Sequence, residues 1–357
     1  MKPRIRRSGT TASDRGFARS LVAIGVLACV LAACGDGSVA PGDASTTPSP
    51  TTTLPVAITI PGSAAGGAFA ALGPVRRIDV LPVAPGGVTP KILANGTMPA
   101  RSLSVAYRQF GSGPDLLLIT GEHGSMTSWD PQVLVALGAY YRVTVFDLPG
   151  VGYTEPSPSA ETVPRLADLT AGLIWSLGLS QPTVVGWGFG GEIAMSLVER
   201  HAGLVWRLVL ADATAGGPKS YRPAGAVSTL LASGLATTVE LSHLFFPAIA
   251  RLARSSWLAD VGQVSPDDIT APAIEAEGSL VAQTDHTSAV AHDLGMIGIP
   301  TLIVAGSADV VVPAANSREL ARAIAHSRLI IFSGAGYASI FQHSSEFVSE
   351  LTVFTNS

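Results

Sequence analysis

Residues 184–194 read VVGWGFGGEIA and join an apolar, strand-like run to a helix-like run. Glycine occupies positions 186, 188, 190 and 191 of this stretch. Glycine adopts a positive φ without steric cost, and its lack of a side chain lets backbone segments approach closely. We therefore expect a sharp turn here, between a buried strand and a helix that pack tightly against each other.

The same change from strand to helix repeats along the chain on both sides of this turn. Short continuous apolar runs, the pattern of strands buried on both faces, occur at 115–120, 141–147, 182–187, 206–212, 300–306 and 328–332. Apolar residues recur at three- and four-residue spacing in 161–178 and 190–202, as in amphipathic helices. This alternation predicts an α/β fold with a mainly parallel central sheet flanked by helices.

Two further parts of the chain lie outside this alternation. Residues 77–83 and 101–111 have the pattern of a preceding pair of strands. The long stretch between the runs at 206–212 and 300–306 contains several helix-like pieces, including 239–253. We expect residues at about 215–285 to form an inserted helical lid over the carboxyl ends of the strands, where an open α/β sheet binds ligands.

Length and composition favour one large domain, which we assign to residues 76–357. The chain has 357 residues, of which 47% are hydrophobic and 13% are charged, so it can bury one large core. The net charge is −4 and the isoelectric point is about 6.0. Because no basic cluster follows the amino-terminal segment, no nucleic acid is expected as a partner.

The amino-terminal segment, residues 1–33, has the features of a signal peptide. Six basic residues and one acidic residue precede an apolar run at 21–33, which is short for a membrane-spanning helix. The run ends in LAAC and so resembles a bacterial lipobox, with Cys34 as the lipidated residue; an ordinary secretory signal is the alternative. Removal of residues 1–33 would change the net charge to −9 and leave Cys34 as the only cysteine.

Residues 34–75 are predicted to be a flexible tether. Positions 35–55 consist mostly of glycine, serine, threonine and proline, which cannot bury enough apolar surface to offset the entropy of ordering. We therefore expect a protein of the cell envelope, anchored through a lipid at Cys34 on the outer side of the bacterial cytoplasmic membrane.

Five motifs occur in the order that is typical of the α/β-hydrolase superfamily, which most of residues 100–355 resemble. They correspond to that family's first central strand with its oxyanion loop, the next strand with its turn, the nucleophile elbow, the acid loop and the histidine segment. In this sequence they are FGSGPDLLLITGEHGSMTSWDP at 110–131, YRVTVFDLPGVGYTEPS at 141–157, VVGWGFGGEIA at 184–194, IPTLIVAGSADVVVP at 299–313 and FSGAGYASIFQHSSEFV at 332–348.

The resemblance places the family's nucleophile at Gly188, its acid at Asp309 and its histidine at Tyr337. The acid position is retained, whereas the nucleophile and histidine positions are vacant. A serine attacks only when an imidazole removes its proton, and the carboxylate acts by orienting that imidazole. The resemblance therefore implies a degenerate triad, in which Asp309 pairs with the Tyr337 hydroxyl in a structural role.

The electrostatic part of the site is expected to remain. The backbone N–H groups of Phe189 and Glu122 are in place to hold a carbonyl or carboxylate oxygen, although the Glu122 side chain would repel an anion if it pointed inward. His123 and Trp187 are predicted to line the pocket. No cofactor is expected, and the histidines at 286 and 292 show no metal-ligand pairing beyond Asp285 and Asp293, so a metal site is not expected.

Other hydroxyl and imidazole groups are candidates for a replacement nucleophile or base. Ser125 and Ser128 follow the oxyanion loop, and Ser339 and His343 follow Tyr337. We interpret the serines as turn or cap residues and His343, within a helix-like run, as a surface or packing residue.

We interpret the chain as an envelope lipoprotein of α/β-hydrolase fold that binds a small apolar ligand or an envelope protein and is inactive as a serine hydrolase. The alternative is an active esterase, lipase or lyase-like enzyme that uses a relocated nucleophile or a bound water, with Asp309, Glu122, His123 or Tyr337 taking part. A third interpretation is a structural protein with a collapsed pocket. The content of the space above Gly188 distinguishes the three.

Overall fold

The computed structural model describes residues 72–85, 102–121, 124–157, 161–232, 236–261 and 293–357, all within the unit Leu54–Ser357. The predicted signal peptide, Cys34 and nearly all of the predicted tether lie outside these residues, as do Glu122, His123 and the later part of the predicted lid. Within the described ranges, no helix has both the length and the apolar character needed to span a bilayer.

One sheet of eight strands forms the centre of the fold and has the order β1-β2-β4-β3-β5-β6-β7-β8. The strands are β1 (Arg76–Val80), β2 (Leu103–Phe110), β3 (Asp115–Ile119), β4 (Arg142–Phe146), β5 (Thr183–Trp187), β6 (Arg207–Ala211), β7 (Thr301–Gly306) and β8 (Ser327–Phe332). β2 pairs antiparallel with β1 and β4, and the pairs from β4 through β8 are parallel. The predicted α/β fold with a mainly parallel sheet is confirmed.

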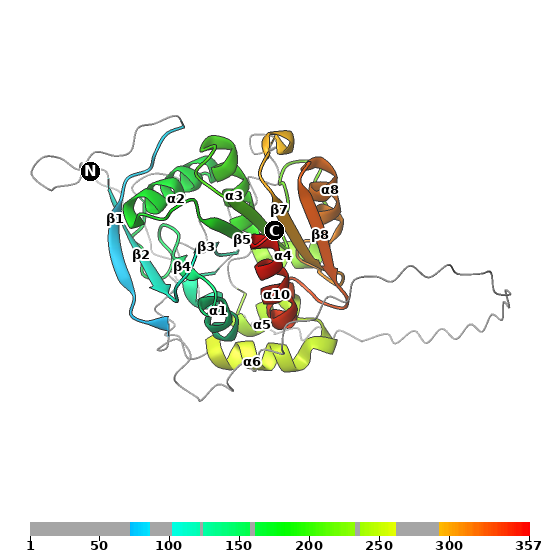
Figure 1. Ribbon diagram of the computed structural model, residues 1–357. Helices are drawn as coiled ribbons and strands as arrows, with labels where there is room; N and C mark the ends of the chain where they lie inside the picture. Colours follow the sequence, from blue (N-terminus) through cyan, green and yellow to red (C-terminus); the bar gives the residue numbers. More distant parts are fainter. Residues whose placement is uncertain (1–71, 86–101, 122–123, 158–160, 233–235, 262–292) are drawn as a thin grey trace, which may run out of the picture. The chain divides into compact units, whose positions relative to one another are not determined.

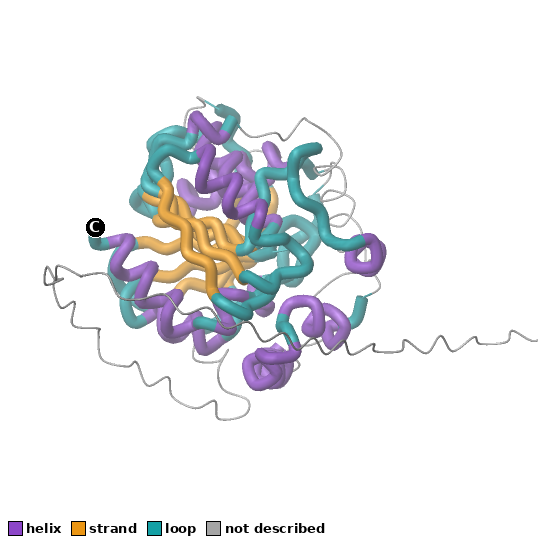
Figure 2. The backbone as a smooth tube through the Cα atoms, turned by 90° about the vertical axis from the view of Figure 1, so that its right-hand side faces the viewer, coloured by secondary structure: helices purple, strands orange, loops and turns teal. Residues whose placement is uncertain are grey.

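Helices cover both faces of this sheet, as Figures 1 and 2 show. Apolar residues of α2 (Val163–Leu177), α3 (Phe189–Arg200) and α8 (Ala315–Ala323) belong to one core cluster. Those of α1 (Pro131–Gly138), α9 (Ser339–Gln342) and α10 (Ser344–Thr355) belong to the other cluster. The strands β3, β5, β6 and β7 are buried along their whole length, which explains their continuous apolar sequences.

The chain between β6 and β7 contributes the helices of the expected lid. Its described part contains α4 (Gly225–Ala232), α5 (Thr238–Phe245), the short 3₁₀ helix η3 (Ala248–Ala250) and α6 (Arg251–Val261), and the 3₁₀ helix η6 (Leu294–Met296) precedes β7. A capping box at Thr237 and Glu240 begins α5. In Figure 1, α6 is the lowest helix, beyond α1 and α10.

Leu72 lies at the end of the segment predicted to be a tether and is buried in the core cluster of α1 and α10. The chain therefore already packs on the domain four residues before β1 begins at Arg76.

Candidate functional site

The sharp turn between β5 and α3 is formed by Gly188. Its φ of 53° and ψ of −119° lie in a region that favours glycine strongly. The Gly188 N–H donates to the Ala211 carbonyl oxygen at the end of β6, at 2.9 Å, and the Gly188 carbonyl accepts from the Gly191 N–H, at 2.9 Å. A Cβ on Gly190 would lie 2.4 Å from the Ile119 carbonyl oxygen, so α3 packs tightly on the sheet.

Tyr337 follows β8 and is completely buried. A Cβ built on Gly121, in the predicted oxyanion loop, would lie 2.8 Å from the Tyr337 hydroxyl oxygen and 3.2 Å from the Trp187 ring. The Trp187 Nε1–H donates to the Tyr337 carbonyl oxygen, at 2.9 Å. Tyr337 thus reaches from the loop after β8 to the oxyanion loop, and both its backbone and its side chain are fixed against Trp187.

An aromatic cluster surrounds Tyr337. The ring centroids of Trp187 and Tyr337 are 5.1 Å apart, and the Phe245 ring, from α5, lies 4.9 Å from Tyr337 and 5.9 Å from Trp187. Phe341 and Trp129 extend the cluster, with ring centroids 5.0 and 6.0 Å from that of Trp187. Because Trp187 directly precedes Gly188, the carboxyl end of β5 is walled by large, rigid apolar rings.

Asp309 follows β7 and is buried, with 8% of the residue exposed. Its Oδ1 accepts hydrogen bonds from the backbone N–H groups of Val311, at 2.7 Å, and Val312, at 2.8 Å. These donors fix the carboxylate within its own loop. The expected bond between Asp309 and the Tyr337 hydroxyl stays a prediction.

Asp212, at the end of β6, is a buried carboxyl that the sequence analysis did not single out. Its Oδ1 accepts from the Gly306 N–H at 2.9 Å, and its Oδ2 accepts from the Ser339 hydroxyl at 2.7 Å and the Ser339 N–H at 3.2 Å. Its φ of 46° is unusual for a residue other than glycine. Burial raises the pKa of Asp212 to about 8, against the opposing effect of these hydrogen bonds.

Asp212 therefore joins the ends of β6 and β7 to the segment that carries Tyr337. A local sequence signal for this contact does not exist, because Ser339 lies 127 residues away along the chain. A second buried aspartate, Asp147 after β4, accepts from the N–H groups of Met126 at 2.6 Å and Tyr153 at 2.9 Å. It holds the segment after the oxyanion loop against the turn that follows β4.

Among the other candidate nucleophiles and bases, the side chains of Ser125 and His343 have capping or packing partners, whereas the hydrogen bond of Ser128 to Trp257 is made by its backbone. Ser125 caps the 3₁₀ helix η2 (Met126–Ser128) by accepting from the Thr127 N–H, and the Ser128 carbonyl accepts from the Trp257 Nε1–H at 3.0 Å. His343 was expected within a helix, but it separates α9 from α10 and stacks on Phe332 with ring centroids 4.7 Å apart. These contacts agree with cap and packing roles.

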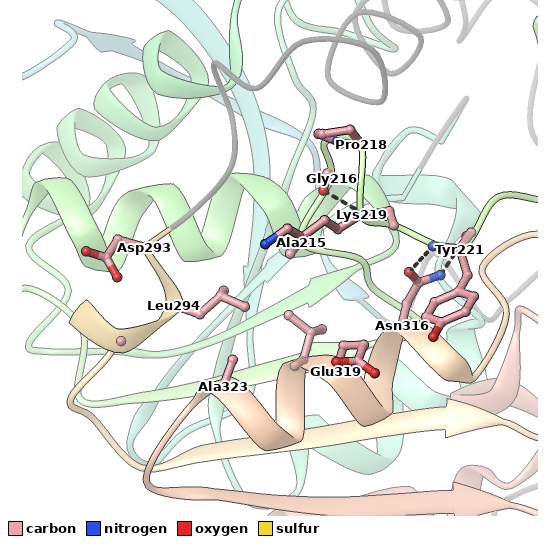
Figure 3. A pocket seen from close by; sticks show the side chains of 13 residues that line it. Ala215, Gly216, Pro218, Lys219, Tyr221, Asp293, Leu294, Asn316, Glu319 and Ala323 are labelled. Atoms are coloured by element: carbon pink, nitrogen blue, oxygen red, sulfur yellow. Dashed lines mark hydrogen bonds between the residues drawn. The ribbon is translucent and has the colours of Figure 1, made fainter.

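A cavity of about 790 Å³ lies between the segment after β6, the start of η6 and helix α8. Figure 3 shows the Lys219, Asp293 and Glu319 side chains at this cavity, and Asn316 bonded to Tyr221. Its lining does not include Gly188, Asp309 or Tyr337. Among the described residues, no group of three or more histidine, cysteine, aspartate or glutamate side chains is placed to hold a metal ion.

Comparison with known proteins relates most of the domain to the alpha/beta hydrolase family. A family model described as the alpha/beta hydrolase family matches residues 116–351. The chain is 29% identical over 260 residues to a pimeloyl-[acyl-carrier protein] methyl ester esterase of Vibrio atlanticus, which covers 68% of this chain and 95% of that protein. It is 30% identical over 251 residues to a putative non-heme bromoperoxidase of Mycobacterium tuberculosis, which covers 67% of this chain and 93% of that protein.

Solved structures share the fold. An alpha/beta hydrolase fold protein from Chitinophaga pinensis aligns with a TM-score of 0.66 at 22% identity and covers 80% of this chain and 98% of its own. An esterase from a Rhodococcus species aligns with a TM-score of 0.62 at 21% identity and covers 79% and 98%. At these identities the structural likeness establishes the fold alone.

Proposed function

Because this chain belongs to the alpha/beta hydrolase family, we propose that it uses that family's fold to bind a small apolar ligand without cleaving it through a serine nucleophile. The single observation that carries the proposal is Gly188, which holds the turn after β5 at φ 53° and ψ −119° and offers no hydroxyl there. A covalent acyl-enzyme needs a nucleophilic side chain beside a general base. Tyr337 stands at the position expected for that base, and a phenol with an ordinary pKa near 10 cannot serve as an imidazole does near neutral pH.

The aromatic cluster supports binding of an apolar group. The rings of Trp187, Tyr337 and Phe245 lie buried against one another at the carboxyl end of β5. Aromatic side chains are common in the walls of sites for apolar ligands, and here a ligand would have to part these rings. The Phe189 N–H begins α3 at the same place, so an ester or carboxyl oxygen would meet the positive end of a helix. An apolar ester or acid fits both features.

The proposal includes the cellular location expected from the sequence. Cys34 would carry the lipid anchor, residues 34–75 would tether the domain, and the ligand or a partner protein would be met in the cell envelope. The anchor and the ligand site lie in different parts of the chain. The location and the chemistry of the site are therefore tested separately.

Placing a serine at position 188 and a histidine at position 337 tests whether their absence explains the lack of serine-hydrolase activity. We expect the double variant Gly188→Ser/Tyr337→His to be labelled by a fluorophosphonate probe and to give a burst of p-nitrophenol from p-nitrophenyl butyrate, because it regains a hydroxyl and an imidazole beside Asp309. The parent and both single variants should remain unlabelled. Gly188→Ser/Tyr337→Phe is the matched control, since it has the hydroxyl and an aromatic ring but no base.

Folding of the variants must be checked, because serine at Gly188 restores backbone strain of about 1–3 kcal/mol. Binding is measured on the parent with methyl octanoate, which should change its tryptophan fluorescence saturably while no octanoic acid is released. Labelling of the unmodified parent, or release of acid by it, would overturn the proposal.

An active enzyme with a non-standard site is the second candidate. It is favoured by the names of the relatives, which include methyl ester esterases and putative carbamate hydrolases. If the active enzyme used a relocated serine, the fluorophosphonate probe would label the parent. If it used an activated water, the parent would release acid from the ester without being labelled.

A further inference from the structure

The lid carries the most exposed large apolar side chains among the described residues. Ile249 is 83% exposed and Leu252 is 78% exposed. They stand three residues apart where η3 joins α6, a spacing that brings side chains to one side of a helix. Further along α6, Trp257 and Asp260 are buried, so the helix also has a side that packs on the domain. Ile249 and Leu252 therefore form an apolar surface that no described part of the chain covers.

The charges beside this surface are basic. Arg251 lies between the two apolar residues in sequence and is exposed, and Arg254 follows one turn later and contacts the His243 ring at 2.6 Å. The third charged residue of α6, Asp260, faces inward. The chain as a whole carries a net charge of −4. A locally basic, apolar surface on an acidic protein is suited to an anionic, amphipathic partner.

We propose that the Ile249–Leu252 surface docks onto an anionic lipid bilayer. Ile249 and Leu252 enter the boundary between headgroups and acyl chains, and Arg251 and Arg254 bind lipid phosphates. Guanidinium groups pair well with phosphate because they present several N–H donors in one plane. Two apolar side chains and two arginines bind weakly, which suits reversible docking of a domain.

The docking surface lies close to the candidate site. A Cβ on Gly334, in the loop after β8, would be 3.9 Å from Ile249 Cγ2, and the Gly334 N–H donates to Ser307 in the loop that carries Asp309. Phe245, at the end of α5, contacts Tyr337. A docked domain would thus turn the carboxyl ends of its strands toward the bilayer. An apolar ligand could then enter the site from the membrane. This last step rests on the proposed function, whereas the docking itself does not.

A local fluorescent reporter tests the docking. The full chain with Cys29→Ser and Cys34→Ser has neither of its two cysteines, so Leu252→Cys can be labelled specifically with an environment-sensitive thiol dye. The labelled protein is mixed with vesicles of phosphatidylcholine, with or without about one third phosphatidylglycerol. We expect a blue shift with the anionic vesicles. Because the dye reports its own surroundings, contact of another segment with the vesicles does not produce this shift.

Matched labels and variants give the controls. Trp175→Cys labels an exposed position on α2, the helix whose apolar residues pack in the other core cluster. The dye at this position should show no shift. In the Leu252→Cys protein, Arg251→Gln should raise the concentration of anionic vesicles needed for half the shift about fivefold, and Ile249→Ser about tenfold.

Three results would overturn the proposal. The first is an unchanged dye spectrum with anionic vesicles. The second is an equal shift at Trp175→Cys, which would indicate non-specific adsorption. The third is a shift that depends on protein concentration without vesicles, which would identify a second copy of the chain as the partner. None of these outcomes depends on whether the site at Gly188 binds or cleaves an ester.

Discussion

At the scale of single residues, Asp212 connects the ends of β6 and β7 to the start of α9 through one buried carboxyl group. Its ordinary pKa is 3.8, and burial raises the pKa in the folded protein to about 8. Between these two values the folded chain holds a proton that the unfolded chain has lost. Stability contributed by this group is therefore complete below about pH 4 and falls as the pH rises toward 8.

We predict that Asp212→Asn flattens the pH dependence of stability. In the parent, the free energy of unfolding should fall by up to about 1.4 kcal/mol per pH unit between about pH 4 and pH 8 through this group. An uncharged amide at the same place removes the proton release on unfolding. Urea unfolding of parent and variant at a series of pH values in this window measures the two slopes.

Asp130→Asn is the control for this experiment. Burial also raises the pKa of Asp130, to about 6, so its replacement should alter the slope only in the lower half of the window. A slope in Asp212→Asn equal to that of the parent would show that Asp212 ionises in the folded protein near its ordinary pKa.

At the scale of elements, α2 and the chain after β1 approach so closely that one glycine decides their packing. A Cβ on Gly172 would lie 2.0 Å from the Leu81 carbonyl oxygen. The Asp168 carbonyl oxygen, one turn earlier on α2, accepts from the Val83 N–H at 2.9 Å. The edge of the sheet at β1 is therefore held to α2 by backbone contact as well as by side chains.

Gly172→Ala should destabilise the fold by about 1–3 kcal/mol, because the added methyl group overlaps a backbone oxygen that cannot move alone. Alanine has a higher helix propensity than glycine, so propensity alone would make the variant more stable. A lower free energy of unfolding would therefore show that the packing clash dominates. Chemical denaturation measures it. Gly225→Ala in α4 is the matched control, since nothing described lies within 4 Å of its added Cβ, and it should stabilise by about 0.4–1 kcal/mol.

The sequence predicted most of the elements because buried strands and amphipathic helices leave local patterns. The run at 182–187 corresponds to β5 at Thr183–Trp187, and the helix expected at 161–178 corresponds to α2 at Val163–Leu177. The break at His343 leaves no local signal, since the apolar pairs at 340–341 and 347–348 recur at a spacing typical of a continuous helix.

The candidate site was predictable only where its motifs are local. Gly188 and Asp309 follow recognisable strand ends, and the structure places them after β5 and β7. The bond between Asp212 and Ser339 and the packing of Phe245 on Tyr337 join segments far apart in the chain. Such contacts depend on the tertiary fold, which periodicity and spacing do not specify.

At the scale of the whole molecule, the proposed anchor and the folded domain are separate parts of one chain. We predict that Cys34→Ser releases the protein from membranes in an alkaline carbonate wash, whereas the parent stays in the membrane fraction. Two acyl chains hold a protein stably, and the weak docking of a lid does not survive the wash. Fractionation followed by immunoblotting measures the distribution.

Cys29→Ser is the control, because Cys29 lies within the predicted signal peptide and should not affect anchoring. Complete retention of Cys34→Ser in the washed membranes would mean that the resemblance of LAAC to a lipobox is incidental.

The order of the strands also affects how the chain comes to be folded. The sheet extends outward from β3, and its parallel pairs each require a crossover connection, so loop closure precedes pairing and folding is slow. β8 and α10 come from the last residues of the chain, and β8 forms an edge of the sheet. A chain truncated after β7 lacks both. Its β7 then presents unpaired backbone N–H and C=O groups along a largely apolar strand, so truncated chains are prone to aggregate.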